Sequence, residues 1–110
     1  MAFYMIQGRY SSEGLKALVA NPRDRREAVA KVIEAVGGKL HAFFYAFGEY
    51  DTVMIAEAPD NVELTAAVMM ALSAGGIAAT KTTALLTWAE GLEAMQKAGR
   101  LSASWTRPGV

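Results

Sequence analysis

Apolar and β-favouring residues concentrate in four segments of the chain, each bounded by glycine, proline or short polar residues. Runs of this length and composition predict β-strands. We expect strands at residues 3–10, 39–47, 52–58 and 77–86. The connection at residues 48–51 is so short that the second and third strands must form an antiparallel hairpin.

Between the first two strands, apolar residues recur at helical spacing. A short helical turn is expected at residues 15–19, and the pair Asn21-Pro22 is typical of a helix start, with asparagine as the cap. Residues 28, 29, 32, 33 and 36 then fall on one helical face. The pair Gly37-Gly38 is expected to end this helix.

Two further helices follow the third and fourth strands. Asp60 with Glu63 approximates a capping box, and the next apolar residues, Leu64, Val68 and Leu72, predict the buried face of a helix that Gly75-Gly76 ends. Thr87 with Glu90 is another capping signal. The last helix carries an apolar stripe of Trp88, Leu92 and Met95, and from residue 99 we expect a polar, extended tail.

The predicted order is β-α-β-β-α-β with an added C-terminal helix. This is the split βαβ plan of ferredoxin-like α+β domains. At 110 residues the chain is long enough for one domain. We assign residues 1–99 to that domain and residues 100–110 to an extended tail.

The strands do not separate apolar from polar residues, because both faces carry bulky apolar groups. The helices can cover only one face of a four-stranded sheet, which would leave a large apolar patch on the other. We therefore expect two sheets to pack face to face in a dimeric α/β barrel. The odd-numbered face is the more polar one and is expected to line the barrel interior, with Gln7, Arg9, Lys39, His41 and Tyr45. The even-numbered face is expected to contact the helices.

Composition narrows the classes of function. Lysine plus arginine equals aspartate plus glutamate at 11 each, so the net charge is zero, which argues against nucleic acid and anionic membranes as partners. The absence of cysteine excludes disulfides, thiolate metal sites and cysteine nucleophiles. No signal peptide or membrane span is visible, so we expect a cytoplasmic protein. The apolar fraction of 53% is above the usual value for globular proteins, and part of the excess is expected in a subunit interface.

The segment from Gly37 to Asp60, GGKLHAFFYAFGEYDTVMIAEAPD, resembles the defining segment of GYD-domain proteins. That family is named after the residues that here are Gly48, Tyr50 and Asp51. The pair Asn21-Pro22 and the threonine-rich last strand also fit, and the resemblance covers roughly residues 1–98. It implies a dimeric α/β barrel, related in architecture to stress-responsive barrels, muconolactone isomerase-like proteins and antibiotic-biosynthesis monooxygenases. It implies no agreed reaction, and an activity taken from those groups would rest on fold alone.

The 48–51 turn carries the first candidate residues. Asp51 could act as a general base or orient a hydroxyl group, with Tyr50 as a proton donor or a wall of a ligand site. The structural alternative is that Gly48 supplies a positive φ angle, Asp51 accepts backbone hydrogen bonds within the turn, and Tyr50 covers the end of the barrel.

His41 is the only histidine and is expected in the middle of a strand on the more polar face. It could transfer protons near neutral pH, or it could bind a metal together with carboxylates such as Glu49 or Asp51. A hydrogen-bonded structural histidine is the alternative. Because no ligand-spacing motif is present, we assign no metal site and no cofactor.

Aromatic groups with a few converging polar groups are typical of a small-molecule cavity. The expected inward positions supply both, and Arg9 or Lys81 could bind a carboxylate or phenolate. The alternative is that these two cations pair with acids across the dimer interface and extend their side chains along the barrel ends. The candidate ligand-binding residues are Gln7, Arg9, Phe43, Tyr50 and Lys81, and the candidate catalytic residues are His41, Tyr45 and Asp51.

Three hypotheses of function follow from these residues, and the third is a metal-dependent site at His41. The first is a homodimeric small-molecule-binding barrel, which could be a cofactor-independent isomerase or oxygenase acting on an aromatic or enolisable compound. The second is a non-catalytic or stress-related assembly protein, in which a side-chain-filled barrel is joined by a tail that docks through Trp105 onto a neighbouring copy.

Overall fold

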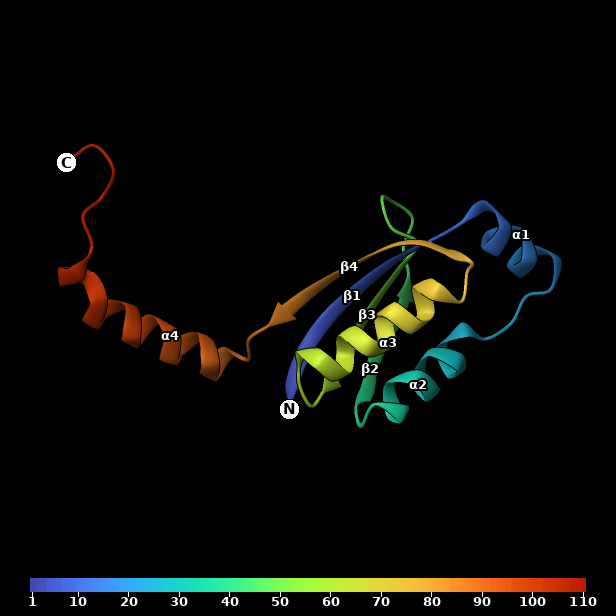
Figure 1. The fold of residues 1–110 in the computed structure, drawn as a ribbon, viewed down its shortest axis with the longest axis horizontal. Helices are drawn as coiled ribbons and strands as arrows, with labels where there is room; N and C mark the ends of the chain where they lie inside the picture. Colours follow the sequence, from blue (N-terminus) through green and yellow to red (C-terminus); the bar gives the residue numbers. More distant parts are fainter.

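The computed structural model describes residues 1–110 and contains one four-stranded antiparallel sheet. Its strands are β1 (Ala2–Tyr10), β2 (Lys39–Tyr45), β3 (Thr52–Ala58) and β4 (Ile77–Leu85), in the spatial order β2-β3-β1-β4. Helices α2 (Arg25–Ala35) and α3 (Asn61–Ser73) lie on the same side of this sheet (Figure 1). The arrangement confirms the predicted ferredoxin-like α+β fold.

The first helical region differs from the prediction at its boundaries. Helix α1 (Ser12–Ala20) is a full helix rather than a short turn, and the Ser11 hydroxyl caps it by accepting from the Gly14 N–H at 3.0 Å. Asn21 ends α1 instead of starting α2. Asp24 caps α2, because its side chain accepts from the Arg26 N–H and the orphan donors of the first turn need such an acceptor.

The later helix signals are confirmed. Gly37 has a φ angle of 82°, and the Gly38 N–H donates back to the Ile33 carbonyl, which closes the end of α2. The Asp60 side chain caps α3 by accepting from the Glu63 N–H. Thr87 and Glu90 form a complete capping box at the start of α4 (Trp88–Leu101), and the short 3-10 helix η1 (Ser102–Ser104) follows. Helical structure therefore continues past residue 100, where the extended tail was expected to start.

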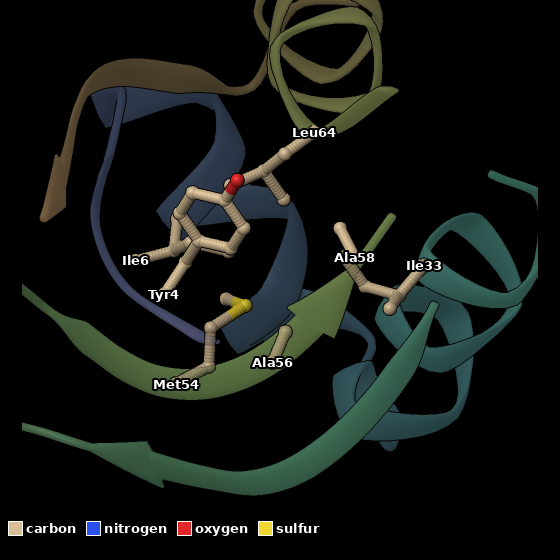
Figure 2. Packing of buried hydrophobic residues seen from close by; sticks show 7 residues of the cluster. All are labelled: Tyr4, Ile6, Ile33, Met54, Ala56, Ala58 and Leu64. Atoms are coloured by element: carbon tan, nitrogen blue, oxygen red, sulfur yellow. The ribbon is translucent and has the colours of Figure 1, made fainter. Parts of the chain in front are cut away.

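The core lies between the even-numbered face of the sheet and the helices. Figure 2 shows side chains from β1 and β3 meeting Ile33 of α2 and Leu64 of α3. The buried cluster is small and consists of Tyr4, Ile6, Ile33, Met54, Ala56, Ala58 and Leu64. Only nine of the 110 residues are buried in the single chain, so most apolar groups remain partly accessible.

Strand β2 contains an irregularity that reverses its faces. Leu40 pairs with Ala56, but the next pair is Ala42 with Ile55, so His41 is an extra residue in the ladder. A bulge of this kind shifts the alternation of side chains by one position. The residues after it, Phe43 and Tyr45, pair with the helix-facing residues Met54 and Thr52.

This bulge corrects the prediction for strand β2. Tyr45 and Phe43 do not share a face with Gln7, Arg9 and His41. Phe43 packs against the core, and its ring meets that of Tyr45 edge-on with 5.4 Å between centroids. Phe44 takes the position on the open face instead. The expected assignment of odd residues to the open face holds for β1, where Tyr4 and Ile6 are buried under the helices.

Helix α4 projects from the rest of the chain as an arm (Figure 1). No residue of α4 is buried, and the large exposed apolar residues along it and the tail are Trp88, Leu92, Met95, Leu101, Trp105 and Val110. The arm gives the chain a radius of gyration of 17.9 Å, compared with about 13 Å for a compact domain of this length. None of the helices has both the length and the hydrophobicity of a membrane span.

Candidate functional site

The open face of the sheet has a shallow pocket of about 250 Å³ next to the β2–β3 loop. Gln7 of β1 pairs with Val53 of β3 on one side and with Lys81 of β4 on the other, so three adjacent strands form its floor. The loop supplies the wall, with Ala46, Phe47, Gly48, Glu49 and Tyr50. The structure thus brings together three of the predicted ligand-binding residues, Gln7, Tyr50 and Lys81.

Arg9 lies beside this pocket and fixes the loop. Its Nε and Nη2 donate to the backbone oxygen of Glu49 at 3.1 and 3.0 Å. Its guanidinium carbon is also 5.5 Å from the centre of the Tyr50 ring, within the range of a cation–π interaction. The guanidinium group has five N–H donors, so donors remain for a ligand.

The two cations at the pocket, Lys81 in its lining and Arg9 beside it, form no ion pair within the chain. None of the three ion pairs in the structure involves Arg9 or Lys81, and the Glu49 carboxylate at the wall pairs with neither. The alternative, in which these two cations pair with acids across a dimer interface, stays a prediction. Two free cations beside an amide and an aromatic ring favour an anionic ligand.

Asp51 is held by the backbone of β1 rather than by its own turn. Its Oδ2 accepts from the Tyr10 N–H at 2.9 Å, and its own N–H donates to the Gly8 carbonyl at 2.8 Å. These bonds tie the loop to the end of β1, where the pairing with β4 shifts register between Arg9 and Tyr10. Asp51 does not line the open-face pocket.

Gly48 does not have the positive φ angle that the sequence led us to expect. A β-carbon at this position would also meet no atom within 4 Å. Within one chain, no feature of the structure explains a glycine at residue 48.

His41 lies on the same open face, but near its other end. Its Nε2 is 2.7 Å from Oε1 of Glu57, and its ring lies 5.4 Å from that of Phe3. Glu57 pairs with Phe3, four residues before Gln7 on β1, which corresponds to about 13 Å along the strand. The histidine and the cationic pocket are therefore two separate places on one surface, and no cluster of three potential metal ligands is present.

Tyr45 lies on the helix side, close to Tyr10. Burial raises the pKa of Tyr10 above its usual value, and the neighbouring Tyr45 hydroxyl raises it further. The guanidinium group of Arg25 acts in the opposite direction and partly offsets these effects. This group of residues was not expected from the sequence, since the bulge that places Tyr45 there has no clear sequence signal.

A second cavity, of about 460 Å³, lies between the sheet and the helices α1, α2 and α3. Sequence reasoning missed it. The signal that could have revealed it is the small size of the residues facing the sheet, since alanine and glycine leave space that larger side chains would fill. Those residues are Gly14, Ala17, Ala28, Ala67, Ala71, Ala74, Gly75 and Gly76.

Two solved structures illustrate the likeness of the fold. MtbAldR is 17% identical over 78% of this chain and 53% of its own length, with a TM-score of 0.56, so the chain spans about half of that protein. TTHA0845 from Thermus thermophilus is 20% identical over 79% of this chain and 95% of its own, with a TM-score of 0.52. At these identities the likeness concerns the fold alone.

The sequence comparison concerns nearly the whole ferredoxin-like body. None of the curated proteins matches the chain. The model of the GYD domain matches residues 4–95, which include the 48–51 turn and nearly all of the four strands. This chain therefore belongs to the GYD-domain family.

Proposed function

We propose that the protein is a homodimer in which the open faces of two sheets pack together and bind a small planar anion between them. The observation that carries this proposal is the pocket lined by Gln7, Tyr50 and Lys81, with Arg9 beside it. Neither Lys81 nor Arg9 forms an ion pair with an acidic residue of the chain.

The apolar residues of the open face support the pairing of sheets. Around the pocket, the face carries Phe3, Met5, Val53, Ile55, Phe44 and Leu85, and none of these residues is buried in the single chain. Soluble monomers rarely expose a continuous apolar patch of this kind. A second copy of the same face would cover it and would close the pocket from the side that is now open.

The accessible surface of the chain also favours a dimer. It measures 7923 Å², whereas a compact monomer of 11.8 kDa exposes about 5,900 Å². The surplus of about 2,000 Å² per chain is in the range that obligate homodimers bury. Part of it belongs to the apolar stripe of α4, which packs on nothing in its own chain.

The geometry of the pocket favours a carboxylate or phenolate on a flat ring. Arg9 is already stacked on Tyr50, so a flat ligand could extend this stacking while its anionic group meets the free guanidinium donors and the Lys81 ammonium. The Gln7 amide can donate or accept a further hydrogen bond. Removing water between two sheets would strengthen each of these interactions.

Benzoate tests the proposal, with uncharged benzamide as the control ligand. We expect a dimer in sedimentation equilibrium and benzoate binding in NMR titrations, with shifts at Gln7 and Lys81. Lys81→Met should weaken the binding of benzoate by about tenfold or more, as expected for loss of a charge-assisted contact. Lys31→Met, which removes an unpaired lysine from the exposed surface of α2, should leave binding unchanged. Equal binding of benzoate and benzamide, or a monomer, would contradict the proposal.

A second candidate function is proton transfer at His41. The observation in its favour is the 2.7 Å contact with Glu57, which could orient the imidazole as a general base beside Phe3. Phenylpyruvate is a suitable enolisable probe, and deuterium exchange at its methylene group can be followed by NMR. If His41 is the base, His41→Asn should slow the exchange by about 10²–10⁴-fold. Exchange at the uncatalysed rate with the unmodified protein would exclude this function for that probe.

A further inference from the structure

We infer that the cavity between the helices and the sheet is a second binding site, which takes an amphipathic carboxylate with a short apolar body. This site lies on the opposite face of the sheet from the anion pocket, although Arg9, which stands beside that pocket, is also among the residues that line the cavity. The inference rests on three observations: the volume and lining of the cavity, the backbone contacts at its edge, and an arginine there that has no acidic partner.

The volume and lining suit an apolar ligand. At about 460 Å³, the cavity falls in the range of small-molecule sites, and 16 of its 24 lining residues are hydrophobic. With about 30 Å³ for a group the size of water or methylene, it has room for about 15 non-hydrogen atoms. Ile6, Phe43 and Met54 of the sheet form one wall, and Val29, Val32 and Val68 of the helices form the opposite wall.

Close backbone contacts lie at one edge of the cavity, which Gly14 and Gly76 line. The Ser11 N–H donates to the Gly76 carbonyl at 3.0 Å, which joins the start of α1 to the connection between α3 and β4. A β-carbon at Gly14 would lie only 2.1 Å from the same carbonyl oxygen. Glycine thus lets α1 approach this connection directly. This contact fixes one edge of a cavity that is only partly enclosed.

Arg25 gives the cavity a charged edge. It lies at the first position of α2, lines the cavity and is only partly exposed. Its neighbour Arg26 takes the nearby acid, since Arg26 Nη2 lies 3.2 Å from Asp24 Oδ2, and Arg25 has no ion pair. An unpaired guanidinium group at the edge of an apolar cavity is a ready partner for a carboxylate.

The tyrosines beside Arg25 add hydroxyl groups to the same edge. Tyr10 lines the cavity, and the guanidinium of Arg25 lies close enough to lower its pKa against the effect of burial. Tyr45 lies next to Tyr10. A carboxylate placed at this edge could therefore accept from the guanidinium and from a phenolic hydroxyl while its apolar chain enters the cavity.

Octanoate is the probe for this site, and 1-octanol is its uncharged control. We expect isothermal titration calorimetry to show octanoate binding that Arg25→Gln weakens by about tenfold or more, with little change for 1-octanol. Arg26→Gln is the matched control, because Arg26 is exposed, is paired with Asp24 and does not line the cavity. It should leave octanoate binding unchanged.

A second pair of variants tests the cavity itself. Ala71 lines it from α3, and Ala66 is exposed on the same helix. Ala71→Leu should abolish binding of both probes by filling the space, whereas Ala66→Leu should bind them normally. Circular dichroism and thermal melting check that both variants are folded. The inference is overturned if the unmodified protein binds no octanoate, or if Arg25→Gln and Ala71→Leu bind it as tightly as their controls.

The two proposed sites can be tested separately. Lys81→Met should leave octanoate binding unchanged, and Arg25→Gln should leave benzoate binding unchanged. Loss of both ligands in either variant would show that the probes share one site, which would overturn the assignment of octanoate to the cavity.

Discussion

Gly14 in α1 lies so close to the backbone of Gly76 that a β-carbon on Gly14 would stand 2.1 Å from the Gly76 carbonyl oxygen. Helix propensity alone would favour alanine at this position by about 1 kcal/mol. The clash is with backbone, which cannot rotate away, so we expect Gly14→Ala to lower the free energy of unfolding by about 1–3 kcal/mol. Urea denaturation measures this change.

Gly91 of α4 is the matched control, because a β-carbon there meets no atom within 4 Å. Gly91→Ala should therefore leave the stability unchanged or raise it slightly through its higher helix propensity. Equal effects of the two substitutions would show that α1 does not pack against Gly76 in solution.

Leu64 and Leu72 test the buried face of α3. Leu64 is only 2% exposed, so Leu64→Ala should cost about 2–5 kcal/mol of stability through lost burial and the cavity left behind. Leu72 is 37% exposed in spite of its helical spacing, and Leu72→Ala should cost about 1 kcal/mol or less. Chemical denaturation compares the two, and a larger loss for Leu72→Ala would contradict the observed orientation of α3.

Phe43 and Phe44 test the bulge at His41, since they lie on opposite faces of β2. Phe43→Ser should lower the free energy of unfolding by about 3 kcal/mol, because Phe43 packs against the core. Phe44→Ser should leave the fold intact and weaken the proposed dimer. Denaturation and sedimentation equilibrium separate the two effects. The reverse result would mean that β2 alternates without a bulge.

Because the pKa of Tyr10 is raised in the folded protein, we expect the stability to depend on pH. In the unfolded chain this pKa is lower, so the unfolded chain releases the proton first as the pH rises. The stability associated with neutral Tyr10 is therefore complete below about pH 10 and is lost as the pH rises through the folded pKa. Tyr10→Phe should make the decline in melting temperature above about pH 10 less steep. An unchanged decline would contradict the raised pKa.

Because helix α4 exposes an apolar stripe, we expect association of the chain to increase its stability. A chain ending at residue 86 lacks Trp88, Leu92 and Met95, and we expect it to dimerise more weakly than the full chain if this stripe packs on a second copy. The melting temperature of the full chain should also rise with protein concentration. Replacing Glu93 and Lys97 of α4 with alanine is the control, since they form an exposed ion pair with each other and their loss should not affect association.

The fold could be predicted from the sequence because its signals are local. Glycine pairs, capping residues and apolar periodicity are set by neighbouring residues, and the hairpin, Gly37 and the Thr87–Glu90 box follow from them. The cap of α2 was placed wrongly at Asn21, because Asn21-Pro22 and Asp24 are both plausible caps and only the packing of α1 decides between them.

The candidate site could be predicted only in part. Gln7, Arg9, Tyr50 and Lys81 come together because β1 alternates regularly and the loop is short. Phe43 and Tyr45 were placed on the wrong face because a single extra residue in a ladder leaves no clear mark in the composition. The large cavity was missed because it depends on the distance between helices, which periodicity does not give.

Arg9 and Tyr10 are consecutive residues that both line the cavity beneath the helices, and the Arg9 guanidinium also lies over the Tyr50 ring beside the open-face pocket. Their shared backbone is held by the Asp51 carboxylate, at the point where pairing with β4 becomes irregular. A movement of this peptide would displace both side chains together. If occupancy of one face shifts it, the other face must respond by the same factor in affinity, because thermodynamic coupling is reciprocal. Asp51, whose carboxylate holds the Tyr10 N–H, would then link ligand binding on the two faces of the sheet.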